Sequence, residues 1–396
     1  MAEHKLPKGF LANGINCGVK RKRKDLALIY SEQMCRVAAV FTNNVVKAAP
    51  VVLARQRLKK NPQVRAIVIN SGNANCMTGR QGIRDAREIC SRMAGLIGAE
   101  DKQVLSSSTG IIGQTMDMDP IIKGMPVLIE GLSRKGLFAA AEGIMTTDIT
   151  SKVSSSKFSS GGKTVRITGI AKGAGMIDPS MATMLCYIMT DANISRQALK
   201  KALLHSNETS FNAITVDGDM STNDTVMVLS NAEAGNPLIG TRGKDYRLFR
   251  EHLEKVCRDL AQMVVRDGEG ASKFIEVNVA GAKSKKDAKK VADAIAGSLL
   301  VKCAVLGGDP NWGRIASSAG SCGVKFDPDR IEIALDGVTF FKNGKAVVQV
   351  NRRSSSVFKG KNVRIDVNLH AGRGEATVYS CDISKKYITL NSFYTT

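Results

Sequence analysis

The segment from Lys172 to Asp191 constrains the fold of this chain more than any other, because it sets a glycine-rich loop between two apolar runs. Residues 164–171 alternate apolar and polar side chains, a pattern typical of a half-buried strand. Residues 184–189 are apolar throughout and predict a buried strand. Glycine and proline interrupt the loop between these two strands. Thr183 therefore stands where an irregular loop meets a core strand, and the strand can hold its hydroxyl in a fixed direction.

Two simpler interpretations of this loop come first. Gly173 and Gly175 supply the first half of the G-x-G-x-x-G pattern that binds phosphate, but Asp178 occupies the third glycine position. No helix pattern follows the loop, and a phosphate site of this kind uses a helix N-terminus. A lone threonine before an apolar run is usually an ordinary strand or cap residue, and composition alone favours that interpretation for Thr183.

The residues around Thr183 closely resemble the signature of a known family. The sequence K-G-A-G-M-I-D-P-S-M-A-T-M-L, at positions 172–185, resembles the motif of the ornithine acetyltransferase (glutamate N-acetyltransferase) family of arginine biosynthesis. The resemblance implies that the precursor cuts itself between Ala182 and Thr183, and that Thr183 becomes the N-terminal nucleophile of a second fragment. A threonine hydroxyl is a poor nucleophile until a base removes its proton, and a new α-amine with a pKa of roughly 7.7–8.0 can be that base.

The charge of the chain raises an alternative function. Its 396 residues include 57 Lys and Arg against 36 Asp and Glu, a net charge of +21, and such a balance can indicate a nucleic-acid-binding protein. The hydrophobic content of 43% and charged content of 23% are those of a globular protein with about two domains. Aromatic residues make up only 5%, and no nucleic-acid-binding motif accompanies basic clusters such as residues 20–24. We therefore expect a solvated basic surface and no nucleic-acid partner.

Cysteine and histidine usage indicates the compartment and the absence of a metal. Nine cysteines are scattered without a C-x-x-C pair, which indicates reduced thiols in a cytoplasmic protein. The four histidines have no metal-site spacing, so no metal is expected. The sequence begins Met-Ala-Glu-His-Lys with no long apolar stretch near this start, so we expect neither a signal peptide nor a membrane span.

Hydrophobic periodicity predicts short strands in the N-terminal third, helices between strands, and a mainly stranded C-terminus. The predicted strands span residues 25–30, 35–41, 64–70, 330–335, 347–351, 364–369 and 375–379. The predicted helices span residues 82–96, 133–144, 196–204, 245–265 and 287–300.

Further motifs resemble the same family and imply site residues. The segment S-S-T-G-I-I-G (107–113) resembles the family loop whose threonine hydroxyl and glycine N–H form an oxyanion hole, which implies that role for Thr109 and Gly110. Losing one such donor costs roughly a hundred- to a thousandfold in rate. The segment M-T-T-D (145–148) resembles a substrate-contacting motif and implies that Thr146 and Thr147 bind substrate.

Charged and terminal residues complete the implied substrate site. A lone lysine is usually a surface residue, but beside a site that holds the carboxylate of an amino acid a lysine is a natural counter-charge. The resemblance implies that Lys172 binds substrate. The motif G-E-G-A-S-K (268–273) implies that Glu269 binds the amine of the substrate. The end of the chain resembles the family's terminal asparagine and hydroxyl contacts, which implies substrate binding by Asn391 and Thr396.

Three other segments match the family without an implied catalytic role. Residues 71–79 are interpreted as a wall of the active-site region, and residues 210–225 as part of its architecture. Residues 307–315, which contain the single tryptophan, Trp312, are interpreted as structural support near the site.

The aspartates at 217 and 219 begin a spacing that resembles a calcium-binding loop. Thr222 replaces the glycine that such a loop requires, and Val228 stands where it needs a bidentate glutamate. We therefore do not expect calcium to bind there.

The resemblance covers about residues 7–396 and implies an α/β fold. The implied architecture is a layered α-β-β-α sandwich of the self-cleaving N-terminal-nucleophile type, with a smaller C-terminal α/β domain. The expected domains are residues 1–275 and 276–396, and self-cleavage would give an α fragment, 1–182, and a β fragment, 183–396.

The implied reaction is a ping-pong acetyl transfer. N2-acetylornithine acetylates Thr183, ornithine leaves, and glutamate takes the acetyl group to give N-acetylglutamate. The resemblance implies no cofactor, leaves open whether acetyl-CoA is a second acetyl donor, and implies an assembly of two α and two β fragments. The alternative enzyme is a self-cleaving aminopeptidase or amidase of related architecture, with water as the acceptor.

Overall fold

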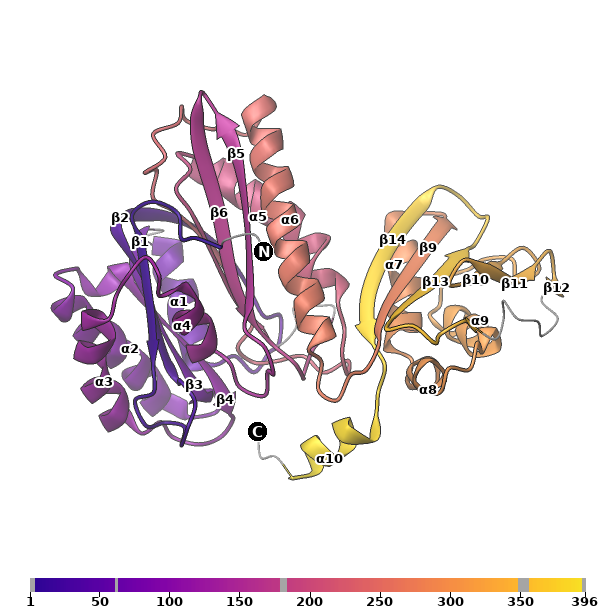
Figure 1. Ribbon diagram of the computed structural model, residues 1–396, viewed down its shortest axis with the longest axis horizontal. Coiled ribbons are helices and arrows are strands. Elements are labelled where there is room, and N and C mark those ends of the chain that lie inside the picture. The colour runs from indigo at the N-terminus through magenta and orange to yellow at the C-terminus, as the bar shows by residue number, and fades with distance from the viewer. Residues whose placement is uncertain (1–3, 61–62, 179–183, 348–355, 394–396) are drawn as a thin grey trace.

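Two β-sheets dominate the computed structural model, which describes residues 4–60, 63–178, 184–347 and 356–393 (Figure 1). The larger sheet has eight strands, and the smaller sheet has six. Three residues with expected roles, Ala182, Thr183 and Thr396, lie outside the described residues. Within the described ranges, none of the helices is both long and apolar enough to cross a membrane.

The larger sheet is mixed, with the strand order β4-β3-β2-β8-β7-β6-β5 and with β1 paired to β2. Its strands are β1 (Phe10–Ile15), β2 (Leu26–Phe41), β3 (Gln63–Asn73), β4 (Val104–Ile111), β5 (Lys152–Ser160), β6 (Lys163–Lys172), β7 (Leu185–Thr190) and β8 (Thr225–Ser230). The pairs β3–β4 and β7–β8 are parallel, whereas the other neighbouring strands of this sheet run antiparallel.

The long strand β2 replaces the two separate strands predicted at residues 25–30 and 35–41. Its first half pairs with β1, its pairing with β3 extends as far as Arg36, and its second half pairs with β8. The pairing with β3 is interrupted between Tyr30 and Cys35, so the residues between the two predicted strands form an irregularity within one strand. As a result, β2 joins the two halves of the larger sheet.

The two halves of this sheet form the inner layers of an α-β-β-α sandwich. One hydrophobic cluster contains Phe10 and Ile67 from the first half together with Tyr187 and Met227 from the second, and all four side chains are fully buried. The helices of this unit are α1 (Ala49–Lys60), α2 (Gly79–Leu96), α3 (Met118–Glu130), α4 (Leu137–Gly143), α5 (Arg196–Glu208) and α6 (Lys244–Arg266), with short 3₁₀ helices at Asp101–Gln103 and Phe211–Ala213. Helices α2 and α3 pack outside the first half, and α5 and α6 pack outside the second (Figure 1). The layered α/β fold expected from the sequence is confirmed.

Helix α6 shows why a sandwich layer forms at this place. Phe249, Leu253, Val256, Leu260 and Val264 recur every three or four residues along it, and all five side chains are fully buried. This apolar face packs on strands β5 and β6, while the opposite face of the helix carries charged residues. The helix predicted at residues 245–265 is confirmed.

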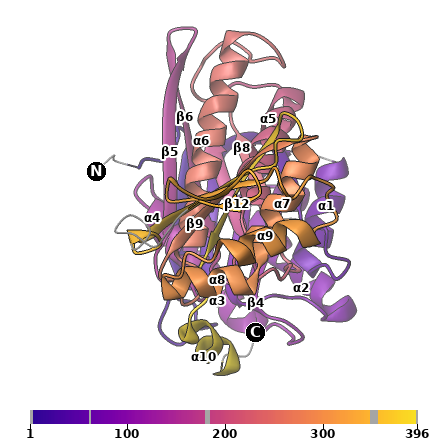
Figure 2. The same ribbon diagram turned by 90° about the vertical axis from the view of Figure 1, so that its right-hand side faces the viewer.

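The smaller sheet has the strand order β12-β11-β10-β13-β9-β14. Its strands are β9 (Phe274–Ala282), β10 (Glu332–Leu335), β11 (Val338–Lys342), β12 (Lys345–Ala346), β13 (Asn362–Asn368) and β14 (Gly374–Cys381). Three helices share a hydrophobic core with this sheet: α7 (Lys285–Gly297), α8 (Leu299–Gly307) and α9 (Trp312–Ser321). In Figure 2, the smaller sheet and these helices face the viewer. The sheet begins at Phe274, and a domain boundary near residue 275 stays a prediction.

The last described helix, α10 (Lys385–Phe393), leaves the smaller sheet and returns toward the larger one (Figure 1). Tyr387 donates a hydrogen bond to Asp217 at 3.3 Å, and Asn391 donates one to Glu269 at 2.8 Å. The helix has no buried residue. Polar contacts therefore hold α10 against the loops of the larger unit.

Candidate active site

A pocket of about 120 Å³ lies where loops of the larger unit meet α10. It is lined by all seven described residues that have an expected site role: Thr109, Gly110, Thr146, Thr147, Lys172, Glu269 and Asn391. The remaining expected residues, Ala182, Thr183 and Thr396, lie outside the described residues. The fold therefore gathers into one pocket residues that are widely separated along the chain.

Thr109 and Gly110 form one wall of the pocket at the end of β4. Gly110 has a φ angle of +134°, and a Cβ atom there would lie 2.3 Å from the carbonyl carbon of Gly72 on β3. Only glycine fits this position, because both the backbone angle and the close approach of β3 exclude a side chain. Thr109 is 3% exposed, and no described residue forms a hydrogen bond with its hydroxyl. That hydroxyl is therefore available to a ligand, as an oxyanion hole requires.

Asn223 connects this wall to the segments that the sequence placed around the site. Its amide donates hydrogen bonds to the carbonyl oxygens of Ala74 at 2.8 Å and Ser108 at 2.6 Å. The Ser108 hydroxyl in turn donates to the side chain of Asn70 at 2.6 Å. Residues 71–79 therefore support the wall from behind without lining the pocket, whereas Asn223 lines it directly.

Lys172 ends strand β6 and is only 3% exposed. Its ammonium donates a hydrogen bond of 3.1 Å to the hydroxyl of Thr146, which lines the pocket beside Thr147. Burial lowers the pKa of Lys172, against the opposing attraction of Asp148 and Glu269. A buried cation next to two hydroxyl groups suits a carboxylate ligand.

Glu269 faces the pocket from the loop that follows α6. Its N–H donates to the carbonyl oxygen of Ala174 at 2.8 Å, and its carboxylate accepts a hydrogen bond from Asn391 at 2.8 Å. A Cβ atom on Gly175 would lie 2.7 Å from the carboxyl carbon of Glu269, so the glycine leaves room for that carboxylate. Lys172 and Glu269 thus present opposite charges to one small pocket, which suits a ligand with both a carboxylate and an ammonium group.

Asp217 and Tyr387 also line the pocket, and sequence reasoning did not identify them as site residues. Asp217 accepts backbone hydrogen bonds from Met176 at 2.6 Å and Ile177 at 2.8 Å, in addition to the bond from Tyr387. This carboxylate therefore fixes the glycine-rich loop. Across the described residues, no three His, Cys, Asp or Glu side chains gather as a metal site would need.

Asp224 anchors the chain immediately after the expected cleavage position. Its Oδ1 accepts a hydrogen bond of 3.0 Å from the N–H of Met184, and the N–H of Thr225 donates to the Met184 carbonyl at 3.1 Å. Asp224 is fully buried, and this burial raises the pKa of its carboxyl group well above the ordinary value. The match of residues 210–225 to the family includes Asp224, but no local pattern gave it this role, because its partner Met184 belongs to a distant segment.

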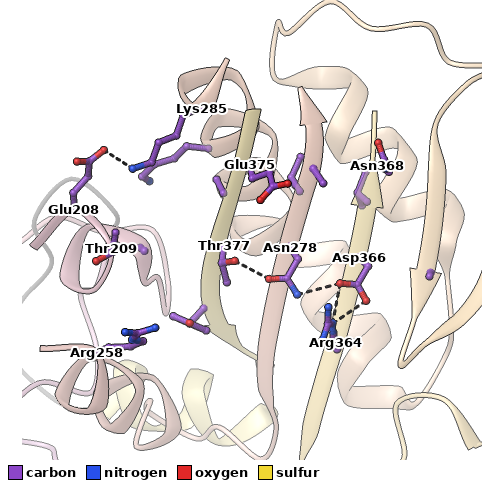
Figure 3. Close-up of a pocket in the computed structure, with 18 of the residues that line it drawn as sticks. Glu208, Thr209, Arg258, Asn278, Lys285, Arg364, Asp366, Asn368, Glu375 and Thr377 are labelled. Atoms are coloured by element: carbon purple, nitrogen blue, oxygen red, sulfur yellow. Dashed lines mark hydrogen bonds and ion pairs between the residues drawn. The ribbon is translucent and has the colours of Figure 1, made fainter. Parts of the chain in front are cut away.

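A larger cleft of about 680 Å³ lies between the smaller sheet and helices α5 and α6. Figure 3 shows its polar lining, in which Asn278 and Arg364 both donate hydrogen bonds to Asp366. Lys285 pairs with Glu208 at 3.1 Å at another part of this lining. None of the expected site residues within the described chain lines this cleft. Because these charged groups neutralise one another, we place the candidate site in the smaller pocket.

Two features singled out in the sequence, Trp312 and the basic segment 20–24, do not line the pocket. Trp312 stacks on a phenylalanine of β11 with ring centroids 5.1 Å apart, so it supports the core of the smaller sheet. In the basic segment 20–24, Lys20 and Arg23 donate hydrogen bonds to backbone carbonyls of residues 145–148. Part of this basic segment therefore holds the loop that carries the two pocket threonines.

The fold and the pocket together define a class of protein. An α-β-β-α sandwich with a polar pocket at the ends of β4 and β6 has the layered α/β architecture that the sequence predicts. The sequence matches the model of the ArgJ family over residues 11–396, and the chain belongs to this family.

Individual members of this family are similar to the chain in sequence over nearly its whole length. The arginine biosynthesis bifunctional protein ArgJ of Caldanaerobacter subterraneus is 45% identical, over 99% of this chain and 98% of that protein. The protein of the same name from Geobacter sulfurreducens is 46% identical, over 98% and 99% of the two chains. The crystal structure of the ArgJ protein of Bacillus halodurans matches with a TM-score of 0.51 and 38% identity, over 52% of this chain and 98% of that chain. The predicted family, and with it an enzyme of arginine biosynthesis, is confirmed, and these matches do not favour the alternative aminopeptidase.

Proposed function

We propose that this chain transfers the acetyl group of N2-acetylornithine to glutamate, giving ornithine and N-acetylglutamate. The observation that carries the proposal is the pocket to which Lys172 and Glu269 present opposite charges. N2-acetylornithine has one carboxylate and one free ammonium group, which supports pairing of the carboxylate with Lys172 and of the ammonium with Glu269. Membership of the ArgJ family supports the same reaction.

Thr183 is the proposed nucleophile. Its Oγ attacks the acetyl carbonyl, its own α-amine takes the hydroxyl proton, and Thr109 and Gly110 stabilise the oxyanion. The carbon–nitrogen bond then breaks, the ornithine nitrogen takes that proton, and an acetyl ester remains on Thr183. The amine of glutamate attacks this ester, the threonine oxygen leaves and regains a proton, and N-acetylglutamate is formed.

The α-amine becomes available only after the chain is cut between Ala182 and Thr183. In the proposed cut, Thr183 Oγ attacks the Ala182 carbonyl, and the peptide nitrogen leaves as an amine. Water then hydrolyses the resulting ester, which leaves a carboxylate on Ala182 and a free hydroxyl on Thr183. The fixed position of Met184 beside Asp224 supports this site, because an intramolecular attack needs a constrained backbone.

Four further residues are proposed to contact substrate: Thr146, Thr147, Asn391 and Thr396. The first three share the lining of one pocket, and Thr396 lies outside the described residues. We propose no cofactor, and we include acetyl-CoA as a second donor that acetylates the same threonine and leaves as the free thiol. We also propose a cytoplasmic enzyme assembled from two α and two β fragments.

The intact mass under denaturing conditions, measured for the wild-type protein beside a Thr183→Ala variant, tests the nucleophile. We expect the wild-type protein to give two fragments, of which the second begins at Thr183. The variant should remain one chain of about 42.4 kDa. An uncut wild-type chain would overturn the mechanism, since no α-amine would then be present at Thr183.

Acetyl transfer is measured next, with N2-acetylornithine as donor and glutamate as acceptor. Parallel reactions replace the donor by acetyl-CoA, or omit glutamate. Formation of N-acetylglutamate is the expected result, whereas equal release of acetate with and without glutamate would indicate a hydrolase. Light scattering of the native protein tests the proposed assembly.

A further inference from the structure

Lys152 is a buried lysine outside the pocket lining, and it has none of the roles described so far. Lys152 begins β5, and its side chain is 1% exposed. Its ammonium lies 2.6 Å from a carboxylate oxygen of Asp148 and 2.6 Å from one of Asp267, and it donates to the Thr150 carbonyl at 3.2 Å. A charge buried so deeply is stable only while its partners stay in place, so the three side chains form one unit.

Asp148 connects Lys152 to two segments that line the pocket. Its Oδ1 also accepts a hydrogen bond from the N–H of Gly173 at 2.7 Å, and its Oδ2 accepts one from the N–H of Thr146 at 3.0 Å. Gly173 directly follows Lys172 in the chain. The same carboxylate therefore fixes the strand end that carries the pocket cation and the loop that carries the pocket hydroxyls.

Asp267 connects Lys152 to a third segment of the pocket. Its Oδ2 accepts hydrogen bonds from the N–H groups of Ile149 at 3.0 Å and Thr150 at 3.2 Å. Asp267 is the C-cap residue that follows helix α6, and it stands two residues before Glu269. The buried ion network therefore runs from the loop that carries the pocket carboxylate to the strand end that carries the pocket ammonium.

We propose that Lys152 is a positioning residue that fixes the separation between the Lys172 ammonium and the Glu269 carboxylate, and thereby selects the length of the amino acid that spans them. The inference rests on the proposed function for the identity of that amino acid. A ligand whose carboxylate and ammonium are one methylene too far apart cannot contact both groups while its acetyl carbon stays in place. Lys152 thus acts through the backbone segments that it holds, without touching substrate.

The test compares two donors that differ by one methylene, N2-acetylornithine and N2-acetyllysine, with glutamate as the acceptor. In the wild-type enzyme, we expect kcat/KM to favour N2-acetylornithine by about 10- to 200-fold. The Lys152→Met variant keeps a long apolar side chain but removes the ammonium group. We expect the ratio of the two kcat/KM values to fall in this variant by about tenfold.

A matched control separates the network from the loss of any lysine. Lys123→Met removes an exposed lysine that lies 3.8 Å from Asp119, and it should leave the ratio unchanged. If Lys152→Met does not fold, Asp267→Asn provides the same comparison, because asparagine keeps an oxygen acceptor and removes one charge beside Lys152.

Each outcome decides one of the two proposals. A folded Lys152→Met or Asp267→Asn variant with the wild-type ratio would assign the network to stability alone and overturn the inference, as would a wild-type enzyme that uses both donors equally. A wild-type enzyme that transfers no acetyl group from N2-acetylornithine would instead refute the proposed function.

Discussion

Asn391 donates a hydrogen bond of 2.8 Å to Glu269, although the two residues stand 122 positions apart in the sequence. Asn391 lies on α10, which the chain reaches only after completing the smaller sheet, and Glu269 lies before that sheet begins. The bond occupies one acceptor position of this carboxylate, which also lines the pocket. The far end of the chain thus completes a pocket whose other walls belong to the larger unit.

Removing the charge of Glu269 should weaken binding of the donor. Glu269→Gln keeps an oxygen that can accept the bond from Asn391, but it loses the attraction for an ammonium group. Because a hydrogen bond to a charged group contributes about 1.5–3 kcal/mol, we expect KM for N2-acetylornithine to rise roughly ten- to a hundredfold. Steady-state kinetics check this, with Glu375→Gln in the larger cleft as a control. An unchanged KM would remove Glu269 from the substrate site.

Filling the space beside Glu269 should have a similar effect without a change of charge. In Gly175→Ala, the new methyl group would lie 2.7 Å from the Glu269 carboxyl carbon, so the flexible end of that side chain has to move. We expect a KM several times higher, with a melting temperature close to that of the wild-type protein. Gly240→Ala is the control, because a Cβ atom there meets nothing within 4 Å. A large fall in melting temperature for Gly175→Ala would contradict this account.

Removing the Thr109 hydroxyl should slow the chemical step. We expect Thr109→Ala to lower kcat for acetyl transfer by roughly a hundred- to a thousandfold, with a smaller change in KM, because an oxyanion donor acts mainly in the transition state. Thr164→Ala, which removes an exposed hydroxyl on β6, should leave kcat unchanged. Equal kcat values for the two variants would exclude Thr109 from the oxyanion hole.

The buried carboxyl group of Asp148 should make stability depend on acidic pH. Burial opposes its ionisation, but Lys152, Lys172 and the hydrogen bonds from Lys152 and Gly173 outweigh that effect and lower the pKa of Asp148 to about 2. A pKa lowered by folding stabilises the protein above the unfolded value of 3.8, and this stabilisation is lost as the pH falls toward about 2.

The shift in the pKa of Asp148 corresponds to about 2 kcal/mol. Asp148→Asn should therefore lower the free energy of unfolding near neutral pH by about 2 kcal/mol and flatten its decline between about pH 4 and pH 2. Urea unfolding at a series of pH values measures both effects. The exposed Asp119→Asn variant should follow the wild-type curve. If the free energy of unfolding of Asp148→Asn falls with pH as steeply as that of the wild-type protein, other carboxyl groups cause the decline.

The periodicity of apolar residues predicted the helices that pack one apolar face against the core. The helices predicted at 196–204 and 245–265 are α5 and α6, because regularly spaced apolar side chains identify them without knowledge of the partner. The helix predicted at 287–300 is divided instead, since Ser298 accepts a hydrogen bond from the N–H of Val301 and begins a new helix. Helix α10 was not predicted, because it buries no residue and has no apolar stripe. The strand predicted at 347–351 lies mainly outside the described residues.

The candidate site likewise has a part that the sequence predicted and a part that it did not. Resemblance to a family supplied its residues one by one, but the contacts that hold them join distant segments and leave no local pattern. Lys152 binds Asp267 across 115 positions, and Asp217 binds Tyr387 across 170. Such partners become visible only when the topology brings their strands and loops together, so neither the buried ion network nor Tyr387 could be predicted from the sequence.

Strands β7 and β8 lie in the middle of the larger sheet, between β2 on one side and β6 on the other. A cut between residues 182 and 183 would assign β2 and β6 to one fragment and β7 and β8 to the other. The two fragments would then interleave, and their separation would require breaking the β2–β8 and β6–β7 ladders at once. A processed enzyme would therefore migrate as one particle in native chromatography and separate into its fragments only in denaturant. The hydrogen bonds of the two ladders would hold the fragments together after the peptide bond is cut.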